Sequence, residues 1–172
     1  PRRLEAEPIR DSILSISGML DLRPGGPGFS GFEVEMENVR HYFPLASYGP
    51  EHWRRMIYMT KVRQEQDSVF GLFDCPDGSQ VMPQRSRSTT PLQALNLLNS
   101  QFVIQQAEFM AARVQEEAGA NTADQVRHAF LLAFSRPPEA GELEDSVSLV
   151  EENGLVTFCR ALINSNEFLF IP

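Results

Sequence analysis

Residues 85–100 have the sequence RSRSTTPLQALNLLNS, and this stretch indicates how the chain folds. Thr90 is typical of a helix N-cap, Pro91 suits the first helical position, and Gln93 stands where a capping box needs a side chain that reaches back to the N-cap. The pair Asn99-Ser100 predicts a break, after which Ser100 can cap another helix. The stretch therefore predicts two consecutive helices joined by a kink.

The sequence after this stretch continues the pattern of helix start and stop signals. The second helix is expected to extend to about residue 117. Residues 122–125, Thr-Ala-Asp-Gln, have the form of another capping box. The helix that they start is expected to stop before Pro137-Pro138, where Pro138 opens the next helix. That helix is expected to end at Asn153-Gly154, and a last long helix covers about residues 155–163.

Upstream of residue 85 the chain is less regular. Apolar side chains recur at helical spacing over about residues 4–17, so we expect a helix there, with Pro8 in its first turn and Gly18 at its end. Residues 19–50 contain many Pro and Gly and are expected to form a long loop segment. Within it, residues 32–36 alternate apolar and acidic side chains, which favours a short, half-exposed strand.

A further helix is expected from Pro50 to about Gln64, with Pro50 in its first turn. Residues 70–82 are punctuated by Gly and Pro and are expected to be irregular. Together these signals predict a mainly α fold, formed as a single helical domain over residues 1–172. We expect five to seven helices, the long irregular Pro/Gly-rich segment over residues 19–50, and at most one short strand pair.

The composition limits the partners that the chain can have. The net charge is −8, and residues 91–172 supply −7 of it from 4 basic and 11 acidic side chains. So acidic a surface is a poor partner for nucleic acid, which binds clustered Lys and Arg. The longest apolar runs, such as residues 130–134, are far shorter than the roughly 20 residues that a membrane span needs. We therefore expect no nucleic-acid partner and no membrane span.

The cysteine and histidine residues form no metal-binding pattern. Cys75 and Cys159 lack Cys-x-x-Cys spacing, and the three histidines are scattered. We therefore expect no metal site and no cofactor in this chain. The two thiols can pair as a disulfide if the protein is exported, or remain as two buried free thiols.

Two arginines that precede the helix start at Thr90 are candidates for binding an anion or a substrate. Arg85 and Arg87 lie just before free backbone N–H groups, which with two guanidinium groups can hold a sulfate, phosphate or carboxylate. Asp74 and Asp77 lie on the loop before them. The alternative is structural: both arginines pair with these two aspartates and fix the loop to the helix.

Asp74 and Asp77 also have a functional interpretation of their own. They can act as acid and base, or bind calcium with Asn99 or backbone carbonyl groups. The alternative is that they serve as turn and cap residues. Asn99 can line a polar pocket, or satisfy backbone carbonyl groups where a helix ends. Aromatic side chains over residues 41–53 can stack on the sugar rings of a carbohydrate, or pack in the core.

Several motifs, in the same order along the chain, resemble those of one family. Residues 73–77, FDCPD, followed by residues 85–99, RSRSTTPLQALNLLN, are similar to the most recognisable stretch of a planctomycete domain of unknown function, number fifteen fifty-three. The segments AFSRPP at residues 133–138 and NSNEFL at residues 164–169 resemble its later signatures. Residues 4–14 resemble its opening helix, so the resemblance covers nearly the whole chain.

The resemblance implies the C-terminal domain of a large exported protein. The neighbours upstream in such proteins are another uncharacterised domain and a cytochrome-c-like domain. Haem c would be attached to that neighbour, because this sequence lacks the Cys-x-x-Cys-His attachment motif. The opening Pro1-Arg2-Arg3 is interpreted as the boundary of a fragment. The family supplies no established catalytic residues, and Cys75 stands where its pattern leads us to expect a small or apolar residue.

Two hypotheses for the function follow. In the first, the chain is a non-catalytic helical module that docks onto upstream domains of its own exported, cytochrome-linked parent protein. This hypothesis rests on the strong helix signals and on the lack of a convincing catalytic constellation. In the second, it is the substrate-binding part of an exported, redox-linked enzyme acting on polysaccharide-derived material. Arg85, Arg87, Asp74 and Asp77 would then face the substrate, and the sequence leaves open whether the chain is an enzyme.

Overall fold

The computed structural model describes residues 1–63, 65–76 and 78–171, and confirms the mainly α fold. The described residues form seven α-helices: α1 (Ala6–Ile16), α2 (Pro91–Asn99), α3 (Gln101–Ala118), α4 (Thr122–Phe134), α5 (Ala140–Asn153), α6 (Leu155–Ile163) and α7 (Asn166–Leu169). They also form four strands: β1 (Arg2–Arg3), β2 (Phe32–Met36), β3 (Arg40–Pro44) and β4 (Phe170–Ile171). Short 3₁₀ turns occur at Pro50–His52, Met56–Tyr58 and Gly71–Phe73.

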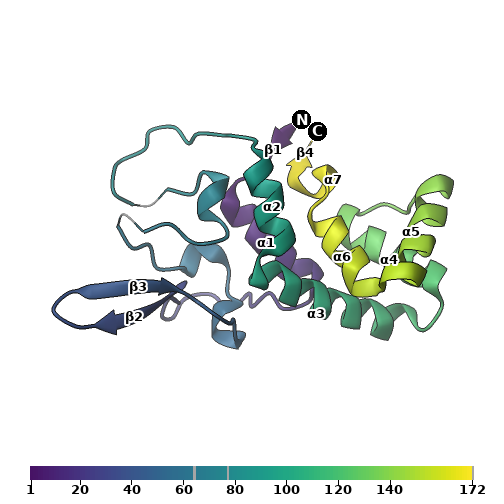
Figure 1. Cartoon of the computed structure of the whole chain (residues 1–172), viewed down its shortest axis with the longest axis horizontal. Coiled ribbons are helices and arrows are strands. Elements are labelled where there is room, and N and C mark those ends of the chain that lie inside the picture. The colour runs from purple at the N-terminus through teal and green to yellow at the C-terminus, as the bar shows by residue number, and fades with distance from the viewer. Residues whose placement is uncertain (64, 77, 172) are drawn as a thin grey trace.

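The core of the domain forms around α3. Helix α6 packs along α3, and α4 contacts both of them. Helix α5 packs against α4 and α6, while α1 and α2 also contact α3 (Figure 1). Phe102, Met110 and Val114 share the buried face of α3, because separations of eight and four residues are close to whole helical turns. Ile163 of α6 is fully buried. Burial of each large apolar side chain contributes about 1.5–3 kcal/mol to stability.

The two helix starts predicted within residues 85–100 are confirmed. Thr90 is the N-cap of α2, and its backbone N–H donates to Gln93 Oε1 at 3.3 Å, as a capping box requires. Ser100 separates α2 from α3, and its Oγ accepts a hydrogen bond from the N–H of Val103 at 3.1 Å. Thr90 thus starts α2, and Ser100 ends α2 and starts α3.

The next two starts differ slightly from the prediction. Asn121 rather than Thr122 caps α4, because Asn121 Oδ1 accepts the N–H of Asp124 at 3.1 Å. Asn is at least as good a cap as Thr, and both precede the same helix. Helix α5 begins after Glu139 rather than at Pro138. The later ends agree with the sequence signals, since Gly154 follows α5 with a φ of 84°.

A second strand pair, which exceeds the predicted limit of one, joins the two ends of the described chain. Strand β1 pairs antiparallel with β4, with Arg2 opposite Ile171 and Arg3 opposite Phe170. The ends therefore lie side by side (Figure 1). Strands of two residues leave no alternating pattern in the sequence, so only the fold reveals this pair.

The strand predicted over residues 32–36 is confirmed as β2, and it forms a hairpin with β3. The two strands pair antiparallel from Phe32 opposite Pro44 to Met36 opposite Arg40. Figure 1 shows this hairpin projecting from the helical part of the molecule. Phe32 is buried at its base, while the side chains farther along are largely exposed.

The helix predicted from Pro50 to Gln64 is wrong for the described residues of that segment, and Gln64 lies outside them. Two 3₁₀ turns occur there, and the backbone pairs with the long loop between the turns at Arg54 and after the second turn at Met59. The N–H of Asp21 donates to the carbonyl of Trp53 at 2.9 Å, and the N–H of Thr60 to that of Phe29 at 2.8 Å. Backbone groups used in this sideways pairing are not available for i to i−4 helical bonds.

The side chain of Arg54 orders the long loop over residues 19–50. Its guanidinium group donates to three loop carbonyl groups, those of Arg23, Gly25 and Pro27. It also lies over the ring of Tyr58, 3.9 Å from the centroid. The nearly buried guanidinium of Arg54 thus satisfies carbonyl groups of residues 23–27, the part of the loop that precedes β2 and has no regular secondary structure.

No helix in residues 1–63, 65–76 or 78–171 is long and apolar enough to cross a bilayer. Cys75 and Cys159 are both buried and unpaired, so the alternative of two free thiols is confirmed.

Candidate functional site

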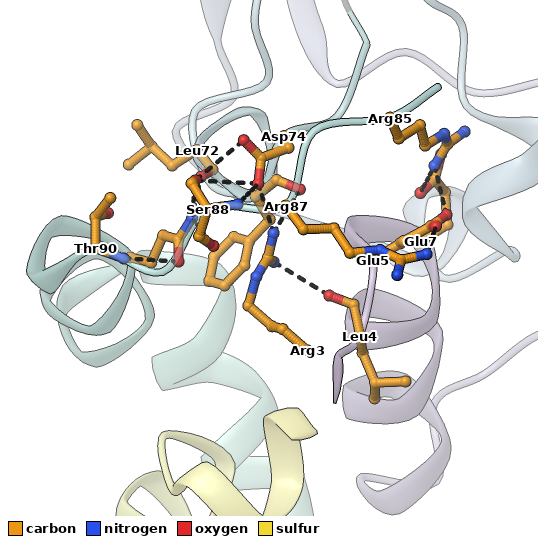
Figure 2. A network of polar contacts seen from close by, with 12 residues as sticks. Arg3, Leu4, Glu5, Glu7, Leu72, Asp74, Arg85, Arg87, Ser88 and Thr90 are labelled. Carbon is orange, nitrogen blue, oxygen red and sulfur yellow. Dashed lines mark hydrogen bonds and ion pairs between the residues drawn. The ribbon is translucent and has the colours of Figure 1, made fainter. Parts of the chain in front are cut away.

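Asp74 lies at a polar joint between distant parts of the chain. It adopts a left-handed conformation with a φ of 58° after the Gly71–Phe73 turn. Its Oδ2 accepts a hydrogen bond from the guanidinium of Arg3 at 2.6 Å and from the N–H of Ser88 at 2.7 Å. The Oγ of Ser88 donates to Oδ1 at 3.0 Å (Figure 2). The carboxylate therefore links β1, the turn and the approach to α2.

Gln93 closes the joint from inside α2. Its Nε2 donates to the carbonyl of Leu72 at 2.8 Å and to Ser88 Oγ at 3.1 Å, while its Oε1 accepts from Thr90. The side chain is almost fully buried. We use the term polar joint for Arg3, Asp74, Ser88 and Gln93. Asp74 is therefore occupied by protein donors, as the turn-and-cap interpretation describes.

Arg85 and Arg87 pair with acidic residues that the sequence did not single out. Arg85 Nη1 contacts Glu7 at 2.7 Å and Glu5 at 3.0 Å, and Arg87 contacts Glu5 at 3.5 Å. The predicted pairing of these arginines with Asp74 is thus wrong, because the carboxylate of Asp74 is taken by Arg3 and Ser88. Figure 2 shows both arginines directed toward the start of α1.

The ion pair between Arg85 and Glu7 shifts the pKa values of both groups. Burial opposes ionisation of Glu7, but hydrogen bonding from Arg85 holds the pKa of Glu7 below its usual value. The hydrogen bond to Glu7 in turn raises the pKa of Arg85. Both groups therefore stay charged at neutral pH, and the pair fixes the segment before α2 onto α1.

An open groove with a volume of about 810 Å³ runs along α1 and is named here the α1 groove. Its charged lining residues are Glu5, Glu7, Asp11, Arg55, Lys61 and Arg85. Carboxylates pair with cations in it: Arg55 contacts Asp11 at 3.1 Å, and Arg85 contacts Glu5 and Glu7. These groups come from three separate segments. No local sequence pattern could have brought them together, although Lys61 stands out as the single lysine of the chain.

The remaining predicted site residues do not join this groove. Asn99 lies at the far end of α2 from the polar joint, and its Nδ2 donates to the carbonyl of Leu95 at 2.8 Å. It thus satisfies a backbone group near a helix end. Asp77 lies outside the described residues. Within the described residues, no three His, Cys, Asp or Glu side chains gather to hold a metal ion.

The fold and the polar joint define a mainly α domain in which a helix start, a left-handed turn and the first strand meet around one carboxylate. The chain belongs to the family described as PSD1, protein of unknown function (DUF1553), which matches residues 1–150. No curated protein and no solved structure matches the chain. The family description names no activity, so the function has to be inferred from the molecule itself.

Proposed function

We propose that this PSD1 chain is a non-catalytic helical module that docks onto upstream domains of a larger, exported, cytochrome-linked protein. The observation that carries the proposal is the β2–β3 hairpin, which projects from the helices (Figure 1). Apolar side chains of this hairpin are exposed. Exposed apolar patches on a folded domain commonly mark surfaces that contact another protein. The hairpin is accordingly the proposed docking element.

The register of the hairpin places the exposed side chains of Val34 and Met36 on one face, while Phe43, paired with Glu33, lies on the other. Val34 stands opposite Tyr42 and Met36 opposite Arg40, so these four side chains share a face with Phe32 at the base. Val34 is 50% exposed and Met36 67% exposed. A two-stranded hairpin is only marginally stable in water on its own. Covering this face would therefore stabilise both the hairpin and the complex.

The charged side chains of the hairpin indicate what charge a partner surface should carry. The opposite face carries Glu33 and Glu35, and Glu37 follows in the turn. Arg40 is the single arginine of the segment 32–44, which contains no lysine. The partner surface is therefore expected to be apolar at its centre and basic at its rim, so that opposite charges meet outside the buried contact.

The polar joint supports the same proposal. The hydrogen bonds of Asp74 and Gln93 connect β1, the Gly71–Phe73 turn and the start of α2. Arg85 forms ion pairs with Glu5 and Glu7. Groups engaged in this way hold segments together, which is what a rigid docking module needs from them.

The proposal is tested with the upstream domains of the parent protein, produced separately and titrated with this chain by calorimetry. The double substitution Val34→Ser, Met36→Ser is expected to weaken association at least about tenfold, because central apolar contacts dominate binding energy. The matched control is Leu131→Ser, Val156→Ser, which removes two exposed apolar side chains from α4 and α6. Absence of association by the unaltered chain, or equal weakening by the control, contradicts the proposal.

The α1 groove favours a second candidate, the substrate-binding part of an exported enzyme acting on polysaccharide-derived material. Lys61, Arg55 and Arg85 line an open groove large enough for a few sugar rings. A titration with acidic oligosaccharides tests it. Binding that is lost on Arg55→Ala and Lys61→Ala supports this candidate, and no binding to the unaltered chain removes it.

A further inference from the structure

Lys61 and Cys75 form a close pair between two irregular segments. The Nζ of Lys61 donates to the Sγ of Cys75 at 2.8 Å. Lys61 follows the Met56–Tyr58 turn, and Cys75 follows the Gly71–Phe73 turn. The only lysine of the chain is thus placed against one of its two thiols.

Lys61 and Cys75 both line a small cavity, and Lys61 also lines the open α1 groove. Lys61 is exposed and lines the α1 groove together with Pro76, the neighbour of Cys75. Lys61 and Cys75 also line a small cavity of about 10 Å³, room for roughly one water-sized molecule. Cys75 itself is 7% exposed, so larger reagents are kept away from the sulfur.

The environment of the sulfur has two opposing effects on its reactivity. Burial raises the pKa of the Cys75 thiol above its usual value, and the hydrogen bond from Lys61 offsets only part of this rise. The positive charge of Lys61 stabilises the thiolate, which is the form that reacts with peroxide. Glu7 and Arg85 also act on this thiol, with opposite signs. The amine is therefore both the group that assists oxidation and the nearest nucleophile to its product.

We propose that Lys61 and Cys75 are a modification site at which hydrogen peroxide produces a covalent sulfur–nitrogen crosslink. The Cys75 thiolate attacks one peroxide oxygen and the O–O bond breaks. The leaving hydroxide takes a proton from the Lys61 ammonium, so that a sulfenic acid, water and an unprotonated amine result. The lone pair of the unprotonated Lys61 Nζ then attacks the sulfur. The S–O bond breaks, the hydroxyl leaves as water with a proton from the amine, and the S–N bond remains. One peroxide is reduced and the pair loses two hydrogen atoms.

Cys159 provides a comparison within the same chain. It is fully buried in α6, and burial raises the pKa of its thiol to about 12. Among the described residues, Lys61 donates a hydrogen bond to Cys75 and none to Cys159. The proposal therefore predicts that the two cysteines differ under the same treatment: Cys75 is crosslinked, and Cys159 remains a thiol.

The crosslink would join the segment that bears Lys61 to the turn that leads into the polar joint. The crosslink would fix the position of Lys61, which lines the α1 groove together with Arg85. The proposal is independent of docking through the hairpin, which lies on other residues.

The test is peptide mapping by mass spectrometry of the full chain after treatment with hydrogen peroxide, using cleavage at acidic residues. The expected product contains the Lys61 and Cys75 peptides joined, with a mass lower than their sum by two hydrogen atoms, and a thiol reductant separates them. Lys61→Arg keeps the positive charge and is expected to give sulfenic and sulfinic acid at Cys75 without a crosslink. Cys159→Ser is expected to crosslink like the unaltered chain.

Three results would overturn the proposal. The first is that Cys75 in the unaltered chain is oxidised to sulfinic acid as in Lys61→Arg, with Lys61 unmodified. The second is that Cys75 remains a thiol under peroxide exposure that oxidises a small-molecule thiol completely. The third is a joined mass that carries an additional oxygen atom, which means a bridge of different chemistry.

Discussion

At the scale of single residues, Asp74 has two properties that few other side chains combine. It tolerates a φ of 58°, where most L residues are strained, and it accepts hydrogen bonds from Arg3 and Ser88 at the same time. Arg3 and Asp74 keep only 4% and 18% of their side chains exposed. The pair is therefore largely shielded from solvent. Removing the carboxylate of Asp74 would leave the guanidinium of Arg3 buried without a counter-charge.

Asp74→Ala is expected to lower the free energy of unfolding by about 3 kcal/mol, because it strands Arg3 and strains the left-handed turn. Asp74→Asn keeps one acceptor oxygen and tolerates the same backbone conformation, so we expect about half of that loss. Urea denaturation followed by circular dichroism measures both. If Ala and Asn at position 74 were equally stable, the carboxylate would not be the centre of the joint.

At the scale of elements, Arg136 links the connection between α4 and α5 to α7. Its guanidinium contacts Glu142 at 2.7 Å and Glu167 at 2.6 Å. The hydrogen bonds from Arg136, with a further one from the backbone of Glu139, lower the pKa of Glu142 from 4.5 to about 2. The same contacts raise the pKa of Arg136.

This pair predicts a definite dependence of stability on pH. Because the folded-state pKa of Glu142 is depressed, its contribution is complete above pH 4.5 and disappears as the pH falls from 4.5 toward 2. Arg136→Met, which keeps an apolar contact with Phe130, is expected to lower the Tm by a few degrees at pH 7. The difference from the unaltered chain should shrink across that acidic window. Arg127→Met, which removes an exposed pair with Asp124, is the control and should change little. A difference in Tm that is as large at pH 2 as at pH 7 argues against the account.

The sequence predicts an element correctly where the interactions that start and end the element are local. The caps at Thr90 and Ser100, and α6 over residues 155–163, follow from side chains within four positions of one another, and these predictions are confirmed. The helix predicted from residue 50 to 64 fails over the described residues because backbone groups of Trp53, Tyr58 and Thr60 bond to the loop backbone about 30 residues away.

The candidate site shows the same division. Arg85 was identified from its position before a helix start, and the structure places it in the α1 groove. Its partners Glu5 and Glu7 were not identified, because they lie 80 and 78 residues away in the sequence. Acidic residues in the first turn of a helix are already favoured by the helix dipole, so the sequence gives no sign of a second role.

At the scale of the whole molecule, different surfaces carry different properties. The half of the chain that contains α2–α7 carries −7 of the net charge of −8. The two described ends meet in the β1–β4 pair, and the β2–β3 hairpin projects away from the helices (Figure 1). A projecting apolar element on an acidic domain fits a module that is held against a basic neighbour.

The most direct test of the docking account is amide hydrogen exchange of residues 32–44, measured in this chain alone and within the larger parent protein that we propose. Exchange reports local opening, and a hairpin with one exposed apolar face should open readily when it is uncovered. We predict that these amides exchange at least about tenfold more slowly in the parent protein, while those of α4 are unchanged. Equal exchange at residues 32–44 in both proteins would show that nothing covers the hairpin, and would contradict the account.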